Sequence, residues 1–385
     1  MKKLFFLDPE LIFLNHGAFG AAPKPVLDVY QSWQNKLERQ PVEFFVREML
    51  GALKTARQTL GDYLKADPDD LVYIPNATYG VNILARSLAL KQGDEILTTD
   101  HEYGACENAW EFVARKTGAK LVRQPIPLPL SSPGEIAEQI WEGVTSRTRV
   151  IFISHISSPT AVRLPVELIC KEAHKAGILT VIDGAHAPGQ IPVDIAAIDP
   201  DFYTGNCHKW MLSPKGAGFL YTRSELQYMV DPLVVSWGWG ENSPFQSGSR
   251  YLDYFEWSGT NDPSAYLSVP AAIRFQEEHN WPEIQSRCQE ILADGVMRIE
   301  ELTGLDSAYS HLAEPFAQMA VVRLPHLRST EKFQDALLQR YRIEVPCIEW
   351  NRQHFLRISI QGYNSREDVE ALVEALRELL PEYTT

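Results

Sequence analysis

Hydrophobic positions in the middle of the chain form short runs that alternate with longer amphipathic stretches. Four apolar runs, several of them rich in β-branched residues, predict strands at 71–75, 94–100, 149–157 and 178–186. Between them, apolar residues recur at helical spacing over 79–93 and 166–177, and Gly93 and Gly177 are expected to end these helices. This alternation predicts an α/β fold with a mostly parallel sheet flanked by helices.

The pattern changes after about residue 265, where a second and smaller C-terminal α/β domain is predicted. Residues 263–280 form a helical stretch long enough to bridge two domains, and 365–379 form an amphipathic helix that Ser365 and Asp368 could cap. Two further strands are expected at 318–325 and 354–361. The expected organisation is an N-terminal segment at 1–15, a large domain at 16–265 and a small domain at 266–385.

Composition and charge exclude several classes of protein. The chain has 385 residues, of which 45% are hydrophobic and 22% charged, and its formal net charge is -14. This acidic balance argues against a nucleic-acid partner, which would need a basic patch. No apolar run reaches the length of a membrane span, and the apolar start is interrupted by Asp8, Pro9 and Glu10, so neither a membrane partner nor a signal peptide is expected.

The five cysteines form no C-x-x-C pair, which disfavours both a disulfide framework and a zinc site. Free thiols in a reducing compartment are the simpler interpretation. We therefore expect a cytoplasmic protein with no metal site.

Two polar residues fall where two strands of the predicted sheet end. Asp183 ends the run "ILTVID", and Lys209 follows "DFYTGNCH". Ligands of an open α/β sheet bind outside the carboxyl ends of its strands, so both side chains should point into one crevice. A salt bridge there would stabilise little, because burying both charges is costly. A lysine and an acid are also what pyridoxal phosphate needs, for its covalent imine and for its protonated ring nitrogen.

The cofactor also needs donors for its phosphate, preferably at a helix N-terminus. The stretch "PNATYGVN" at 75–82 offers the hydroxyl of Thr78 and the amides around Ala77 and Thr78, and Thr204 and His208 stand just before the lysine. Each motif alone has an ordinary structural explanation, such as a helix cap or a surface lysine. Their joint order favours the cofactor site.

The order of "NATYG", "DGAHAPG", "TGNCHKW" and "SPKGAGFLY" resembles the class V aminotransferase family, the branch that contains cysteine desulfurases. The resemblance extends from "LNHGAFG" at residue 14 to "LRISIQGYNSREDVEAL" near the C-terminus. Three stretches resemble the isopenicillin N epimerase group in particular: 14–26, 155–166 and 255–273. The resemblance implies an aspartate aminotransferase-like fold of type I, pyridoxal 5'-phosphate as cofactor, an amino-acid substrate and a homodimer with shared active sites.

The resemblance also implies roles for individual residues. Lys209 would bind the cofactor covalently and exchange the proton at Cα, and Asp183 would bind the ring nitrogen. Tyr103 would stack on the ring, and His186 would lie near the phenolic oxygen, although a satisfied core histidine is an alternative. The phosphate would be held by Ala77, Thr78, Thr204 and His208, and by Thr260 from the partner subunit.

Substrate contacts are expected at the other end of the site. Arg357 matches the arginine that binds the substrate α-carboxylate, since a guanidinium is shaped for bidentate contact. Ser158 in "HISSPTAVRLPV" is a further candidate, and Asn15 and His16 either line the pocket or only shape the "NHGAFG" turn. Arg47 is either a second anchor or a residue of a solvated helix face.

Several reactions remain open at this stage. The resemblance favours an amino-acid epimerase, for which Tyr103 or His16 could serve as a second base. A cysteine or cysteine-sulfoxide C–S lyase and an aminotransferase are the alternatives within the family. A cysteine desulfurase is not expected, because Cys347 stands at the start of a short loop segment rather than inside an exposed one. Outside the family, a cofactor-free α/β binding protein is the alternative, and a hydrolase is disfavoured because no G-x-S-x-G elbow is present.

Overall fold

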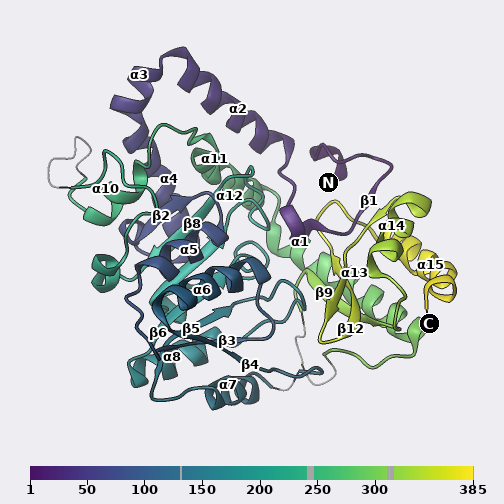
Figure 1. Cartoon of the computed structure of the whole chain (residues 1–385). Helices are drawn as coiled ribbons and strands as arrows, with labels where there is room; N and C mark the ends of the chain where they lie inside the picture. Colours follow the sequence, from purple (N-terminus) through teal and green to yellow (C-terminus); the bar gives the residue numbers. More distant parts are fainter. Residues whose placement is uncertain (131, 241–246, 310–311, 313–315, 385) are drawn as a thin grey trace.

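A computed structural model of the chain describes residues 1–130, 132–240, 247–309, 312 and 316–384. The chain forms two lobes, of which the larger is built on a central sheet and the smaller on the C-terminal strands and helices (Figure 1). None of the described helices combines the length and the hydropathy that crossing a bilayer requires.

The large sheet has seven strands. Their order across the sheet is β2 (Leu71–Ile74), β8 (Gly218–Thr222), β7 (Phe202–Asn206), β6 (Leu179–Gly184), β5 (Thr148–Ser154), β3 (Glu95–Thr99) and β4 (Lys120–Gln124). Strand β8 runs antiparallel to both neighbours, and the other pairs are parallel. The predicted α/β class and mostly parallel sheet are therefore confirmed, with β4 and β8 as strands that the apolar pattern did not indicate.

Helices cover both faces of this sheet. Alternate strand residues enter two separate apolar clusters, because successive side chains of a strand point to opposite faces. Helices α5 (Ala77–Ser87) and α6 (Gly104–Thr117) pack into one cluster, and α7 (Pro133–Glu142) and α8 (Val166–Ala176) into the other. A strand buried on both faces has a continuous apolar run, as residues 150–153 of β5 show.

One predicted helix end differs from the structure. Helix α8 stops where expected, because Gly177 takes the left-handed conformation that ends a helix. Helix α5, however, ends at Ser87 and not at Gly93, since Leu88 turns into extended conformation and buries its side chain. Gly93 instead has a φ of 87° in the turn before β3.

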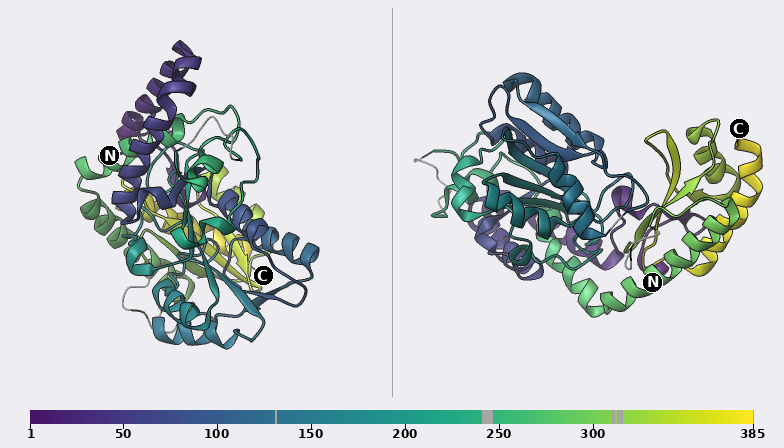
Figure 2. Two further views of the ribbon diagram at one scale, coloured as in Figure 1. Left: turned by 90° about the vertical axis from the view of Figure 1, so that its left-hand side faces the viewer. Right: turned by 90° about the horizontal axis from the view of Figure 1, so that it is seen from below.

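The link between the lobes is longer than the sequence indicated. The stretch expected as one helix at 263–280 forms α11 (Ser264–Leu267) and α12 (Val269–Glu278), and Pro270 lies in the first turn of α12, where no N–H is needed. The following helix α13 (Trp281–Thr303) is the long one, and the right-hand view of Figure 2 shows it running along the small lobe.

The small lobe contains an antiparallel sheet in the order β11 (Cys347–Trp350), β12 (Gln353–Ser359) and β9 (Met319–Leu324). Helices α13, α14 (Thr330–Tyr341) and α15 (Arg366–Tyr383) pack with it. The strands expected at 318–325 and 354–361 and the final helix are confirmed, and the Asp368 carboxylate accepts the Ser365 N–H.

The N-terminal segment joins the small lobe. Strand β1 (Ile12–Phe13) pairs in parallel with β10 (Ile343–Glu344), and α1 (His16–Phe19) then leads the chain toward the large lobe. The boundaries predicted at 15/16 and 265/266 stay predictions. The remaining helices are α2 (Lys24–Arg39), α3 (Pro41–Glu43), α4 (Met49–Leu64), α9 (Ile195–Ile198) and α10 (Arg250–Glu256).

Arg47 lies on an exposed helical stretch that precedes α4. Its guanidinium pairs with the Glu43 carboxylate four residues earlier, and both side chains are solvated. Of the two interpretations of Arg47, the structure supports the solvated helix face.

Candidate active site

The largest feature at the carboxyl ends of the strands is a cavity of about 580 Å³. Strands β5, β6 and β7 end at it, and Arg357 reaches it from β12 of the small lobe. Lys209 and Asp183 both line it, so the crevice expected from the topology of the sheet is present.

Lys209 stands three residues beyond the end of β7, and its amine lies inside the cavity. Its Nζ is 3.1 Å from Nε2 of His186. Burial and then the charge of Arg357 lower the lysine pKa from 10.5 to about 8, although Asp183 and Cys106 act in the opposite direction. A neutral amine is the form that can attack a carbonyl carbon.

Asp183 is fully enclosed at the end of β6. Its Oδ1 accepts the Ala185 N–H at 2.9 Å, and its Oδ2 accepts the Cys106 thiol at 3.4 Å. Burial raises the carboxyl pKa, and these two bonds together with Lys209 act against that rise. A buried carboxylate that faces a cavity and meets no cation in direct contact suits a protonated ring nitrogen.

The N-terminus of α5 forms another wall of the cavity. Asn76 caps the helix by accepting the Tyr79 N–H at 2.9 Å, and Ala77 and Thr78 line the cavity. His208 lines it as well, with its Nδ1 2.9 Å from the Ala217 carbonyl oxygen. The first turn of an eleven-residue helix and these polar groups fit a phosphate.

Thr204 does not share this wall. Its hydroxyl is fully buried within the sheet and donates to the Phe219 carbonyl oxygen at 3.0 Å. Asn206, two residues nearer the end of β7, lines the cavity and accepts the Ala77 N–H at 2.9 Å. The alternation of side chains along a strand would have indicated Asn206, because it shares a face with Thr204 and lies closer to Lys209.

Arg357 is the guanidinium on the small-lobe side of the cavity. It is only 6% exposed, and its Nη1 donates to the backbone oxygen and to Oγ of Ser158. Its Nε is buried without a partner, and no carboxylate of the described chain pairs with it. Burial lowers its pKa to about 10. An unpaired buried guanidinium is suited to an anionic ligand.

Tyr103 stands at the N-terminus of α6 and lines the same cavity. Its side chain is 46% exposed, which is unusual for a large aromatic residue and leaves one ring face open. The geometry therefore allows a planar ligand to stack on it.

Asn15 and His16 lie outside the residues that line the cavity. The His16 ring is fully buried behind Lys209, 3.1 Å from the lysine carbonyl oxygen and 2.9 Å from the Tyr363 hydroxyl. Burial lowers its pKa to about 3. Asn15 donates to Glu344. Their expected substrate contacts find no support in this geometry.

Several cavity residues had no signal in the sequence analysis. Lys215 lines the wall while its amine donates to the Gly20 carbonyl oxygen at 2.9 Å, and Phe19 lies beside it with 74% of its surface exposed. Ser154 and Ile348 also contribute. Ile348 shows why Cys347 is absent from the cavity, since neighbouring strand residues point to opposite faces.

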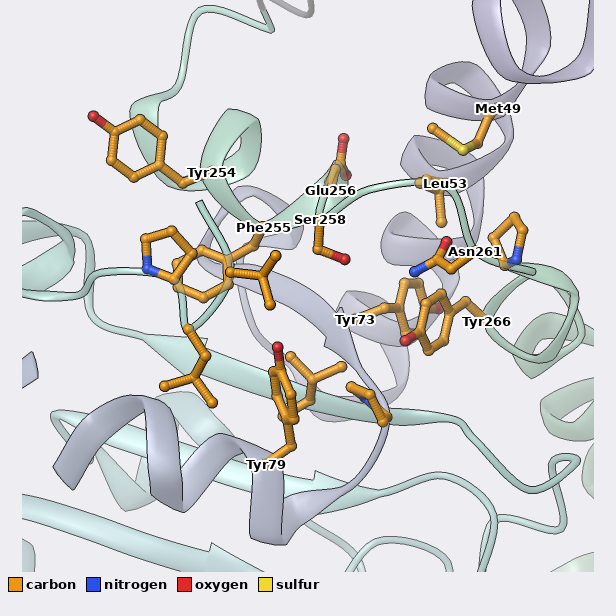
Figure 3. A pocket seen from close by; sticks show the side chains of 16 residues that line it. Met49, Leu53, Tyr73, Tyr79, Tyr254, Phe255, Glu256, Ser258, Asn261 and Tyr266 are labelled. Carbon is orange, nitrogen blue, oxygen red and sulfur yellow. The ribbon is translucent and has the colours of Figure 1, made fainter. Parts of the chain in front are cut away.

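A second, smaller cavity of about 60 Å³ lies beyond Pro75, under the loop that follows α10 (Figure 3). Glu256 at the end of α10 and Ser258 of the loop line this cavity, together with Tyr73 and Tyr266. Thr260 is exposed on the same loop and does not line the large cavity of its own chain.

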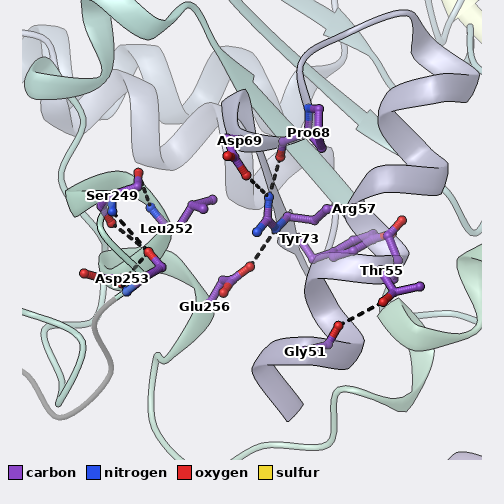
Figure 4. A network of polar contacts seen from close by, with 12 residues as sticks. Gly51, Thr55, Arg57, Pro68, Asp69, Tyr73, Ser249, Leu252, Asp253 and Glu256 are labelled. Carbon is purple, nitrogen blue, oxygen red and sulfur yellow. Dashed lines mark hydrogen bonds and ion pairs between the residues drawn. The ribbon is translucent and has the colours of Figure 1, made fainter. Parts of the chain in front are cut away.

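A buried ion pair holds the start of this loop (Figure 4). Arg57 of α4 donates from Nε to Glu256 at 2.7 Å and from Nη1 to Asp69 at 3.0 Å and to the Pro68 carbonyl oxygen. Both Arg57 and Glu256 are less than a tenth exposed, so each charge depends on the other.

Comparison with known proteins identifies the family. The sequence model of the class-V aminotransferases matches residues 12–372. The chain is 37% identical to an isopenicillin N epimerase of Amycolatopsis lactamdurans, with 97% of this chain and 96% of that protein covered. It is 33% identical to the isopenicillin N epimerase of Streptomyces clavuligerus, covering 98% and 96%.

Solved structures agree on the fold. A cysteine desulfurase of Escherichia coli superposes with a TM-score of 0.81 at 23% identity, covering 100% of this chain and 98% of that chain. A cystine C–S lyase superposes with a TM-score of 0.80 at 21% identity, covering 98% and 99%. The chain belongs to the class-V aminotransferase family, and it is a pyridoxal-phosphate-dependent enzyme of fold type I. The cofactor-free alternative is thereby excluded.

Proposed function

We propose that this enzyme acts at Cα of an amino acid and that it is an amino-acid epimerase. The observation that carries the proposal is the placement of one amine, one buried carboxylate and one unpaired guanidinium around a single cavity, at Lys209, Asp183 and Arg357. Two relatives above 30% identity over nearly the whole chain are named isopenicillin N epimerase, which supports this choice among the reactions of the family.

The residues of the cavity have different roles in the proposed reaction. Arg357, held by Ser158, binds the α-carboxylate, and the amine of Lys209 removes and returns the proton at Cα. When bound, pyridoxal phosphate supplies an electron sink for the charge left on Cα. Asp183 holds a proton at the ring nitrogen, and Tyr103 stacks on the ring.

The phosphate is assigned to the wall around the N-terminus of α5. Ala77 and Thr78 contribute from the helix, and Asn206 and His208 from the end of β7. Thr204 is a weaker candidate, because its hydroxyl is committed to Phe219.

Epimerisation requires a proton to return on the opposite face of Cα. His16 cannot reach the cavity, so the structure supports either Lys209 acting alone on both faces or Tyr103 acting opposite it. His186 contacts the amine directly, at 3.1 Å, and therefore stands on the lysine side.

A C–S lyase is the second candidate. Elimination at Cβ needs a base only at Lys209, which the cavity provides. Relatives at 25–29% identity include L-cysteine desulfhydrases and a hercynylcysteine sulfoxide lyase.

An amino-acid panel in deuterated water distinguishes the candidates. Deuterium at Cα with inverted configuration supports the epimerase. Pyruvate with ammonia identifies a lyase, and a keto acid with the amine form of the cofactor identifies a transaminase. Absence of any Cα exchange across the panel would contradict the proposal.

We also propose a homodimer in which Thr260 reaches the phosphate of the partner subunit. The exposure of Thr260 and its distance from its own cavity support this, as do exposed apolar side chains such as Phe19 and, at 70% exposure, Trp237. The five free thiols suit a reducing compartment, so a cytoplasmic location is proposed as well.

A further inference from the structure

Trp210 contacts His186 on the side that faces away from Lys209. The indole Nε1–H donates to Nδ1 of His186 at 3.3 Å, while Nε2 of the same ring is 3.1 Å from Nζ of Lys209. An indole nitrogen can only donate, so Nδ1 must offer a lone pair. A neutral imidazole with a lone pair on Nδ1 carries its proton on Nε2.

The position of that proton favours one protonation state of the lysine over the other. An Nε2–H can donate to the lone pair of a neutral amine. An ammonium has no lone pair, so its hydrogens and the Nε2–H would face each other without an acceptor. The ammonium form would need the proton of His186 on Nδ1, where it would meet the indole N–H. The hydrogen bond between the indole and the His186 ring would then be lost.

We propose that Trp210 is a positioning residue, which fixes the proton of His186 on Nε2 and thereby favours the neutral amine of Lys209, the form that binds the cofactor, over its ammonium form. The proposal rests on the function proposed above for Lys209. It explains why the lysine is followed by a tryptophan, whose N–H donates a hydrogen bond that an apolar side chain could not donate.

The three side chains have little freedom to rearrange. Trp210 is fully buried, its ring packs against His16 at 4.9 Å between centroids, and its carbonyl oxygen accepts from Gln276 at 3.0 Å. The His186 carbonyl oxygen accepts from Gln190 at 2.7 Å. The indole therefore cannot turn away without disturbing its neighbours.

Several other titratable groups surround the pair. Burial lowers the pKa of His186 well below its ordinary value, with Lys209, Arg357 and His16 contributing in the same direction. The titratable and charged groups near Lys209 are His186 and Asp183 from the β6 region, Arg357 from β12, Cys106 from α6, His16 from α1 and the neighbouring His208. Within the described part of the chain, the hydrogen-bond partner of the His186 Nδ1 is the Trp210 indole, so the tautomer depends on Trp210.

The direct test is the tautomer itself. Protein labelled with ¹⁵N-histidine is prepared without cofactor, and the two ring nitrogens of His186 are assigned by comparison with His186→Gln. We expect a proton-free Nδ1 and a protonated Nε2. A proton on Nδ1 would overturn the proposal, and this result does not depend on any activity of the enzyme.

The second test uses Trp210→Phe, which keeps an aromatic ring and removes the N–H. The rate at which the protein captures free pyridoxal phosphate is measured by absorbance at a series of pH values. The midpoint of this pH profile is expected to rise by about one pH unit, so that capture at pH 7 becomes about tenfold slower. Trp110→Phe is the control, because Trp110 is equally buried, lies on α6 and has an indole N–H without a partner in the described chain.

The outcomes that test the role of Trp210 differ from those that test the proposed function. Equal shifts in Trp210→Phe and Trp110→Phe would mean a packing effect and would overturn it. In a His186→Gln background, Trp210→Phe is expected to shift the midpoint no further. Failure of the unmodified protein to bind pyridoxal phosphate through Lys209 would refute the proposed function, while the tautomer measurement would stand by itself.

Discussion

Arg357 and Ser158 meet across the two lobes, where Nη1 of the guanidinium donates to Oγ of Ser158 at 3.2 Å. The serine belongs to the loop that follows β5, and the arginine belongs to β12 of the small lobe. This bond orients a buried cation toward the cavity without neutralising it. The remaining N–H groups of Arg357 are therefore left for a ligand.

Replacing Arg357 by lysine should weaken substrate binding. A lysine cannot reproduce the planar fork, so we expect kcat/KM for the amino-acid substrate to fall by about 30- to 1000-fold, or about 2–4 kcal/mol, mainly through KM. Steady-state kinetics measure this. Arg323→Lys on the adjacent strand β9 is the control and should change little. An unchanged KM in Arg357→Lys would show that the carboxylate binds elsewhere.

Lys209 should make the cofactor-free protein less stable at neutral pH. Its folded pKa of about 8 lies below the unfolded value near 10.5, so the folded state must give up a proton or bury a charge. The cost is complete below pH 8 and disappears as the pH rises from about 8 to 10.5. We expect cofactor-free Lys209→Met to be more stable than the parent by roughly 1–3 kcal/mol at pH 7, with the gap closing toward pH 10.

Urea unfolding at a series of pH values measures that gap. Lys65→Met, an exposed lysine on the surface, serves as the control and should show no such pH dependence. A gap that stayed constant between pH 7 and 10 would indicate that the Lys209 amine stays charged up to pH 10 in the folded protein, as it does in the unfolded chain.

Asp183→Asn should separate cofactor binding from chemistry. A neutral amide cannot hold a proton at the ring nitrogen, so the exchange of the Cα proton should slow by about 100-fold or more while the cofactor still colours the protein. Deuterium incorporation and absorbance measure the two properties. Asp201→Asn, a buried acid bonded to Thr180 on the same sheet, is the matched control. Equal exchange rates in the two variants would remove Asp183 from the mechanism.

Removing one member of the Arg57–Glu256 pair should destabilise the protein. Arg57→Leu leaves a buried carboxylate without its partner, and we expect a loss of about 3–5 kcal/mol in the free energy of unfolding. Arg57→Leu combined with Glu256→Leu should recover a large part of that loss. Urea denaturation of Arg57→Leu, Glu256→Leu and the double variant checks this, and additive losses in the double variant would argue against a direct pairing.

Cys347→Ala should leave the reaction unchanged. None of the five cysteines lines the large cavity, and Cys347 lies on β11 with its backbone N–H bonded to Gln334. We expect activity within about twofold of the parent, and no persulfide after incubation with cysteine. Persulfide on Cys347 would point to sulfur transfer instead.

The pattern of apolar and polar positions along the chain determined the class of the fold and the lysine and acid of its active site. Buried parallel strands carry near-continuous apolar runs, so β5 and β6 could be recognised, and polar residues at their ends could be placed at one edge of the sheet. Lys209 and Asp183 followed from that rule, and a family resemblance extended the set to Arg357, Tyr103 and His186.

Tertiary structure alone decided which nearby polar residues reach the cavity. Thr204 and Asn206 share a face of β7, but Thr204 is buried against β8, whereas Asn206, at the end of the strand, lines the cavity. His16 is removed from the site because the N-terminal strand pairs with β10 and carries it behind Lys209. The contacts of His16 and of the N-terminal strand join residues that are more than 190 positions apart, and no local spacing rule specifies them. The proton of His186 depends in the same way on the orientation of one indole ring.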